Sequence, residues 1–216
     1  MSHAGETAAA QAGSGVSLRR AVKAAVFGVA WLCVLPLIVI SWLEKNLIRS
    51  EVLFVSASQL LAIVPSPIGS FMRAAFYSCT LNRCSWEVHI GFGSLFTHRG
   101  AALGARVSTG AYCVIGHADI GDDVMMASRV SIPSGKRQHL DDEGNLAPVL
   151  RFDRVAIGSE CWVGEGAIIL ADVGPRAIVS AGALVIKTMP GGCLIGGNPA
   201  RVLKELGSPS AAPAAE

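Results

Sequence analysis

The sequence predicts a parallel β-helix that follows an N-terminal membrane helix, and three patterns in its 216 residues indicate this architecture. From about Val88 onward, an aliphatic residue followed by a small one recurs every six positions. A run without any charge, residues 24–43, precedes this repeat. The period shortens slightly before Ile120 and before Val173, and it fails over residues 133–154, where the composition becomes polar. We therefore expect one long loop to leave the β-helix.

The composition excludes some classes of protein before any motif is considered. Hydrophobic residues make up 51% of the chain and charged residues 16%, with a net charge of +2, so no nucleic-acid partner is expected. The six cysteines lack CxxC spacing. We interpret them as reduced thiols, because the chain is neither short nor rich in cysteine, and this favours a cytoplasmic location for the folded part of the chain.

The chain divides into four regions. Residues 1–18 and 207–216 are rich in Ala, Gly and Ser, and we expect both ends to be flexible. Between them we expect membrane-associated helices over 19–82 and the repeat domain over 83–206.

Residues 24–43 are long enough to cross a hydrocarbon layer of about 30 Å as a helix. Trp42 suits the membrane interface, and three basic residues, Arg19, Arg20 and Lys23, precede the run as a cytoplasmic-side signal. A buried core helix is the alternative interpretation.

A second apolar run, Val52 to Val64, is short for an independent span. Either it forms a tight hairpin that returns the chain to the cytoplasmic side, or Pro36 kinks the first segment within one leaflet while the second run lies along the interface. The sequence leaves both topologies open. Residues 71–81 then indicate an amphipathic connecting helix near the membrane surface.

The repeat predicts the fold of the catalytic region. A six-residue unit fits a short strand plus a corner, with its first residue pointing into a narrow prism, and three units make one coil. A Gly-rich β-sandwich is disfavoured, because no hairpin dipeptides accompany the pattern. The first positions of the repeats are Leu103, Thr109, Ile115, Ile120, Met126, Ile132, Ile157, Val163, Ile169, Val173, Val179 and Val185.

These features resemble the hexapeptide-repeat acyltransferases, especially those that O-acetylate sugars and polysaccharides. The resemblance covers about 84–206 and rests on the repeat, the SGKRQH loop, the IGSECWVGEGAIIL segment and the closing GGNPARVLKEL. It implies an all-β left-handed parallel β-helix, a homotrimer with active sites between subunits, and acetyl-CoA bound along the coils. We also expect a short C-terminal helix.

The implied activity is transfer of an acetyl group from acetyl-CoA to a hydroxyl of a sugar or of a lipid-linked or surface glycan precursor. The membrane segment places the enzyme at the cytoplasmic membrane, with the catalytic domain facing the cytoplasm. No metal is expected. The sequence does not identify the sugar, the hydroxyl or the length of the acyl chain.

The acceptor hydroxyl must lose its proton as it attacks the thioester, and histidine has the proton affinity for this step near neutral pH. We predict His139 as the catalytic base, with an acidic residue at 141–143 orienting its ring. Related enzymes often carry TGHxxH here, and Lys136 stands at the position of the first histidine, so His139 matches only the second. His117 is the reserve candidate, and a packed coil residue is its ordinary interpretation.

The resemblance also assigns acetyl-CoA contacts. By position these are Glu165 and Ala181 along the pantetheine arm, and Lys187 and Arg201 at the phosphates. A guanidinium can engage two phosphate oxygens at once, although Lys187 and Arg201 are equally understandable as solvated surface charges. The family often has Thr-Lys where this chain has Ile186-Lys187, so one hydroxyl contact is absent.

Three other functions stay open. One is N-acylation of an amino sugar. Another is a zinc-dependent, carbonic-anhydrase-like β-helix, because His98 and His117 are separated by about one coil and a third ligand could come from His139 or another chain. The last is a non-catalytic trimeric scaffold tethered to a membrane.

Overall fold

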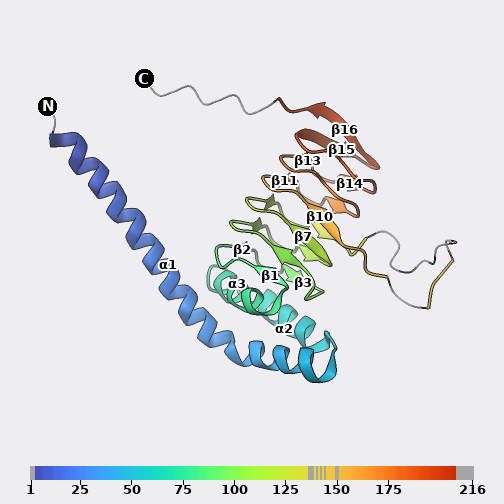
Figure 1. Ribbon diagram of the computed structural model, residues 1–216, viewed down its shortest axis with the longest axis horizontal. Coiled ribbons are helices and arrows are strands. Elements are labelled where there is room, and N and C mark those ends of the chain that lie inside the picture. The colour runs from blue at the N-terminus through green and yellow to red at the C-terminus, as the bar shows by residue number, and fades with distance from the viewer. Residues whose placement is uncertain are drawn as a thin grey trace.

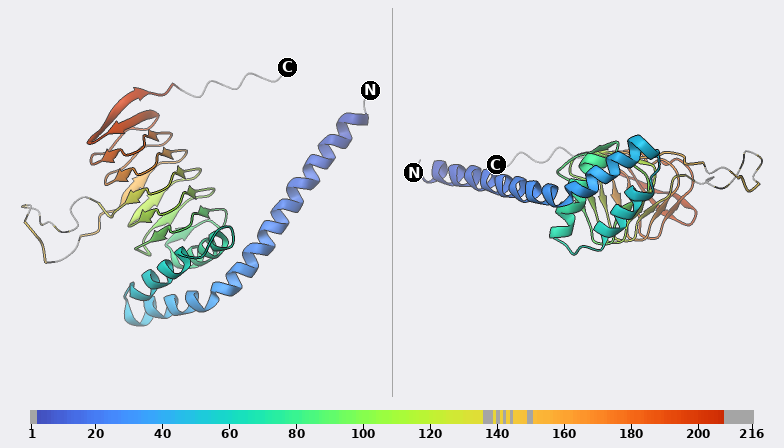
Figure 2. Two further views of the ribbon diagram at one scale, coloured as in Figure 1. Left: turned by 180° about the vertical axis from the view of Figure 1, so that it is seen from behind. Right: turned by 90° about the horizontal axis from the view of Figure 1, so that it is seen from below.

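A solenoid of stacked β-coils, closed at its N-terminal end by helices, dominates the computed structural model of the protein (Figure 1). The structure describes residues 3–135, 139, 141, 143, 145–148 and 151–207, without the side chains of 3–20. Seen from below, the helices lie across one end of the solenoid (Figure 2).

Four helical elements precede the solenoid. They are α1 (His3–Leu43), the π-helix η1 (Glu44–Ile48), α2 (Val52–Ala62) and α3 (Ile68–Thr80). The first 18 residues, expected to be flexible, belong to α1 from His3 onward. Their sequence is rich in alanine, the residue with the highest helix propensity.

The strands form three sheets, one along each side of the solenoid, and all the pairs are parallel except that of β15 with β16. Their orders are β1-β4-β7-β10, β2-β5-β8-β11-β13-β15-β16 and β3-β6-β9-β12-β14, and we call these the first, second and third sheets. The strands are β1 (Arg83–Cys84), β2 (His89–Ile90), β3 (Leu95–Phe96), β4 (Ala102–Leu103), β5 (Ser108–Thr109), β6 (Val114–Ile115), β7 (Ala118–Ile120), β8 (Met125–Met126), β9 (Ser131–Ile132), β10 (Val155–Ile157), β11 (Trp162–Val163), β12 (Ile168–Ile169), β13 (Ile178–Val179), β14 (Leu184–Val185), β15 (Cys193–Gly197) and β16 (Ala200–Glu205).

The first residue of each repeat points into the solenoid, as the six-residue period predicts. All twelve positions named above, from Leu103 to Val185, are at most 4% exposed. The small residues that follow them allow the coils to approach closely: a Cβ on Gly110 would lie 2.5 Å from the backbone nitrogen of Ser128 on the next coil. The period therefore encodes both the buried column and the stacking of the coils.

The expected short C-terminal helix is wrong. Residues Ala200–Glu205 form strand β16, which pairs antiparallel with β15. The last coil presents an edge of unpaired backbone groups, and pairing with β16 satisfies them. This tertiary demand overrides the helical preference of the ARVLKEL sequence.

Helix α2 packs on the protein rather than forming a second membrane span. Its 11 residues extend about 16 Å, roughly half of a hydrocarbon layer. Its buried side chains include Phe54, which stacks on Phe76 of α3 with ring centroids 5.8 Å apart. In turn Tyr77 of α3 packs edge-on against Phe96 of β3 at 4.7 Å. The two helices thus join the first coil, and the hairpin topology of two spans does not fit this structure.

From residue 21 onward, helix α1 exposes many apolar side chains. Segment Ala21–Ile48 is long and apolar enough to cross a membrane, and 17% of its most apolar window is buried inside the protein. Val29 is 62% exposed, Leu32 63% and Trp42 61%. Low burial of this kind argues against a core helix of a soluble protein, the alternative considered from the sequence.

Candidate functional site

One corner of the solenoid collects most of the candidate residues. It follows the strands of the third sheet and leads into the first sheet, and we call it the loop-side corner. His98 follows β3, His117 follows β6, and the segment between β9 and β10 contains His139. Because coils stack about 4.8 Å apart, equivalent corner residues on successive coils become neighbours. The ring centroids of His98 and His117 are 6.4 Å apart.

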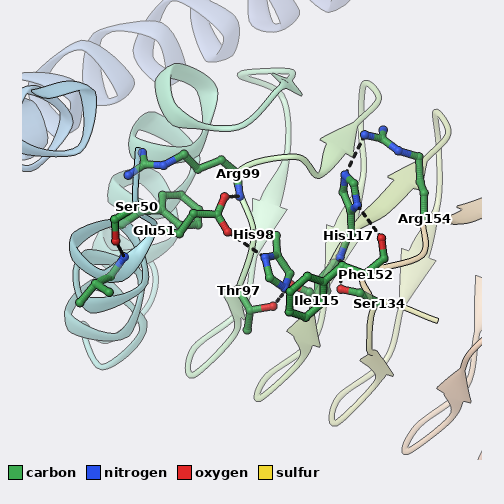
Figure 3. A network of polar contacts seen from close by, with 12 residues as sticks. Ser50, Glu51, Thr97, His98, Arg99, Ile115, His117, Ser134, Phe152 and Arg154 are labelled. Carbon is green, nitrogen blue, oxygen red and sulfur yellow. Dashed lines mark hydrogen bonds and ion pairs between the residues drawn. The ribbon is translucent and has the colours of Figure 1, made fainter. Parts of the chain in front are cut away.

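The imidazole of His98 binds a carboxylate from the helical region (Figure 3). Its Nδ1 lies 2.8 Å from Oε2 of Glu51, the residue immediately before α2. The other carboxylate oxygen accepts a hydrogen bond of 2.9 Å from the backbone N–H of Arg99. Burial alone would raise the pKa of Glu51, but the hydrogen bonds from His98 and Arg99 outweigh it and lower that pKa. Glu51 is therefore a fixed, ionised partner for His98.

His117 lies on the next coil and is held by other groups. Its Nε2 is 2.8 Å from Nη2 of Arg154, whose Nη1 binds Asp119 at 2.5 Å. Its Nδ1 lies 3.5 Å from the carbonyl oxygen of Phe152, and its backbone N–H binds Ser134 at 2.8 Å. A guanidinium can only donate, so Nε2 of His117 is the acceptor in this pair. The lone pair of Nε2 therefore already accepts a hydrogen bond from Arg154.

The end of the loop packs back against this corner. The ring of Phe152 lies 4.4 Å from that of His98, and the backbone N–H of Asp153 donates to the carbonyl of Ser134 at 3.0 Å. Figure 3 shows Glu51, His98, Phe152, His117 and Arg154 as one group. The corner thus combines a helix start, two coils and a loop end.

His139 is exposed, and its backbone carbonyl accepts from the N–H of Ala147 at 2.9 Å. The carboxylate of Asp141 accepts from the backbone of Glu143 and Asn145. Among the described residues, the hydrogen-bond partners of the His98 and His117 rings are Glu51, Arg154 and the carbonyl of Phe152, and the His139 ring is not one of them. Positions 136 and 142, singled out in the sequence, lie outside the described residues.

The four predicted acetyl-CoA residues are all exposed but occupy different faces. Glu165 and Ala181 lie on successive coils at the corner after the second sheet, where the N–H of Gly182 donates to the carbonyl of Glu165 at 2.8 Å. Lys187 follows β14 on the loop-side corner, and Arg201 lies on β16 opposite Gly196. Of the four residues, only Glu165 and Ala181 lie close together in the structure.

The six-residue repeat could not have predicted three residues of the site, Glu51, Phe152 and Arg154. The first comes from the helical region, and the others stand where the period has failed. The zinc hypothesis draws no support from the described residues, among which no cluster of three His, Cys, Asp or Glu side chains is placed to hold a metal ion.

Comparison with known proteins agrees with this architecture. No family model matches the chain. The chain is 46% identical over 87 residues to "Putative acetyltransferase YvoF" of Bacillus subtilis (strain 168), a match covering 38% of this chain and 51% of that one. It is 36% identical over 77 residues to a 2,3,4,5-tetrahydropyridine-2,6-dicarboxylate N-acetyltransferase of Staphylococcus aureus (strain JH9), covering 33% and 32%. The chain thus spans about half or a third of these relatives.

Solved structures share the fold. A maltose O-acetyltransferase from Clostridium difficile 630 superimposes with a TM-score of 0.66 at 20% identity, over 77% of this chain and 91% of that one. The hexapeptide-repeat acetyltransferase VCA0836 from Vibrio cholerae, complexed with acetyl-CoA, gives 0.56 at 19% identity, over 71% and 86%. A galactoside acetyltransferase in complex with coenzyme A gives 0.56 at 18% identity, over 72% and 80%.

Proposed function

Because the chain has the β-solenoid fold of the hexapeptide-repeat acetyltransferases, we propose that it transfers an acetyl group from acetyl-CoA to a hydroxyl group of a sugar. The observation that carries the proposal is the loop-side corner, where a long loop and two histidines meet on such a solenoid. The maltose and galactoside enzymes among the structural neighbours support a sugar acceptor.

The reaction requires a base and a site for acetyl-CoA. A histidine that removes the hydroxyl proton contributes about 100- to 10,000-fold in rate. His139 is the base that the sequence predicts, with His117 in reserve. We propose Glu165 and Ala181 along the pantetheine arm of acetyl-CoA, and Lys187 and Arg201 at its phosphates. No step of this chemistry calls for a metal. The resemblance further suggests a homotrimer.

Release of CoA from acetyl-CoA tests this function. Detergent-solubilised protein is assayed with a panel of neutral sugars and amino sugars, alongside alanine variants of the three histidines of the loop-side corner and its loop, His98, His117 and His139. We expect release to depend on a neutral sugar and to fall by about 100-fold or more in the variant that lacks the base. The control is His89→Ala, because His89 lies on β2 of the second sheet, away from the loop, and its Nδ1 contacts Ser70 of α3 at 3.0 Å.

Each other outcome rejects a defined part of the proposal. Release stimulated by amino sugars alone, with acetylation at nitrogen, would replace O-acetylation by the N-acetylation that the Staphylococcus match suggests. If no acceptor stimulates CoA release, the protein is not a sugar acetyltransferase. A zinc-dependent enzyme, tested by metal analysis of the purified protein, and a non-catalytic scaffold would then be the remaining functions.

We also propose that α1 anchors the protein in the cytoplasmic membrane, with Pro36 kinking the apolar segment within one leaflet so that the solenoid stays in the cytoplasm, where acetyl-CoA is found. The exposed apolar residues of segment Ala21–Ile48 support this attachment. A membrane anchor concentrates the enzyme near membrane-bound acceptors, so a lipid-linked saccharide or surface-glycan precursor is the acceptor class we favour.

Leu32→Lys is expected to weaken membrane binding strongly. Leu32 is 63% exposed in the middle of the apolar segment, and a lysine at the centre of a membrane helix costs about 2.5 to 3.5 kcal/mol. Flotation of the full-length protein with phospholipid vesicles should show a clear loss of the bound fraction. Leu203→Lys, at a 61% exposed position on β16, is the matched control and should float like wild type. Equal flotation of both variants would reject the anchor.

A further inference from the structure

We propose that His98 is the general base of the acetyl transfer and that Glu51 is its positioning residue. This inference rests on the proposed function and deepens it by naming a different histidine from the one expected in the loop. Its basis is the short contact between the imidazole and a carboxylate contributed by the helical region.

The contact with Glu51 determines which nitrogen of His98 can act. An ionised carboxylate can only accept, so Nδ1 carries the proton in the 2.8 Å hydrogen bond. In the neutral ring the lone pair is then on Nε2, the nitrogen that would take a proton from a hydroxyl. The His98 side chain is 21% exposed, which leaves the ring accessible from outside. A base oriented in this way by a third group is the arrangement that acid–base catalysis requires.

The other two histidines lack this arrangement. Nε2 of His117 accepts a hydrogen bond from Arg154, so its lone pair faces a cation instead of a substrate. His139 is exposed on the loop, and the neighbouring carboxylate of Asp141 binds the backbone of its own turn. Of the three candidates, His98 therefore has the tautomer and the partner suited to the task.

The carboxylate of Glu51 is held in place from its other side. Its Oε1 accepts from the backbone N–H of Arg99, while the guanidinium of Arg99 binds the buried side chains of Ser41 and Glu44. Glu51, η1 and the end of α1 are thus tied to the first coil through Arg99. The helices that carry the proposed membrane anchor also supply a group of the proposed site.

The proton balance of the step is simple. Nε2 of His98 takes the proton of the acceptor hydroxyl as its oxygen forms a bond to the thioester carbonyl carbon. The carbon–sulfur bond then breaks, and the CoA sulfur leaves with the electron pair. The imidazolium returns its proton to that sulfur, so the products are the acetyl ester, CoA with a free thiol and neutral His98. Glu51 stays ionised and stabilises the imidazolium between the two transfers.

Several charged or titratable groups surround His98 and enter the pH dependence. They are Glu51 before α2, Arg99 next to it in the chain, and His117 with its partner Arg154 on the neighbouring coil. A protonated imidazole has no lone pair with which to act as a base, so we expect kcat/KM to fall on the acid side of the profile.

The test measures kcat/KM of the full-length protein against pH, with acetyl-CoA and the sugar that stimulates wild type most. His98→Asn should lower kcat/KM by about 100- to 10,000-fold and abolish the acid limb of the profile. Glu51→Gln presents an amide N–H to Nδ1 and reverses the tautomer, so we expect a fall of about tenfold or more. It should also move the acid limb to lower pH, while Glu51→Asp, which keeps the charge, should retain more activity than Glu51→Gln.

Two controls separate this role from a structural one. Ser41→Ala loosens the same junction through Arg99 without touching His98, and should keep the acid limb in place. His139→Ala is assayed beside them and tells the two candidate bases apart. If His139→Ala is inactive while His98→Asn is active with an unchanged profile, the base is in the loop and this inference fails, although the acetyltransferase function stands. If wild type itself releases no CoA with any acceptor, the proposed function fails first.

Discussion

Replacement of Arg73 by methionine should lower the free energy of unfolding by about 3 to 5 kcal/mol. Arg73 is fully buried between α2, α3 and the first coil. Its guanidinium donates to the carbonyls of Leu61 at 2.8 Å and Val64 at 2.9 Å, where α2 ends, and to that of Ile90 at 3.0 Å. Burial lowers the pKa of Arg73, and these carbonyls compensate the desolvated charge.

Methionine fills similar space but donates no hydrogen bond, so three carbonyls would be left without this partner. The measurement is urea-induced unfolding of the full-length protein in detergent, followed by circular dichroism. The matched control is Arg106→Met on the solenoid surface, where the ion pair with Asp123 is exposed and contributes little. A loss of stability in Arg73→Met no greater than in Arg106→Met would show that Arg73 does not hold the helices on the solenoid.

Glu44→Ala is expected to destabilise the protein by a similar amount, about 3 to 5 kcal/mol, for a different reason. Glu44 is 1% exposed and pairs with the guanidinium of Arg99, which is 8% exposed and stacks on Phe54. Its two oxygens also accept from the backbone N–H groups of Leu53 and Phe54 at 2.7 and 2.9 Å, at the start of α2. Alanine would leave a buried cation unpaired and the helix start without an acceptor.

A second substitution distinguishes the charge from the capping. Arg99→Met added to Glu44→Ala removes the unpaired cation, and should recover part of the lost stability in the same unfolding measurement. If the double variant is less stable than Glu44→Ala by the full cost of a second mutation, the two side chains act independently, and the pairing of charges at this junction is not what stabilises it.

Both predictions concern the junction between the helices and the first coil, a region that the sequence left open. Glu44 and Arg99 are 55 positions apart, and Arg73 and Ile90 are 17 apart. No periodicity connects such pairs. The sequence left the topology of Val52 to Val64 undecided for the same reason, since its partners are the side chains of α3 and the first coil.

The repeat domain was the most predictable part of the molecule. Each six-residue unit supplies an aliphatic residue for the interior and a small residue for the corner. A unit therefore needs only a neighbouring unit of the same kind on which to stack. The period also placed His98 and His117 about one coil apart, and the structure has their rings 6.4 Å apart. At the C-terminus the local sequence wrongly predicted a helix. Residues Ala200–Glu205 instead pair with the open edge of β15 as strand β16.

The solenoid, its buried column, the apolar length of α1 and the interruption of the repeat are predictable from the sequence, because each depends on residues close together in the chain. Which histidine meets a carboxylate depends on tertiary packing. Glu51 reaches His98 across 47 positions, through a turn between helices and a coil edge whose relative placement depends on the packing of Phe54, Tyr77 and Arg73. Hydrogen bonds of this kind depend on where whole elements lie, and no local pattern of residues records that.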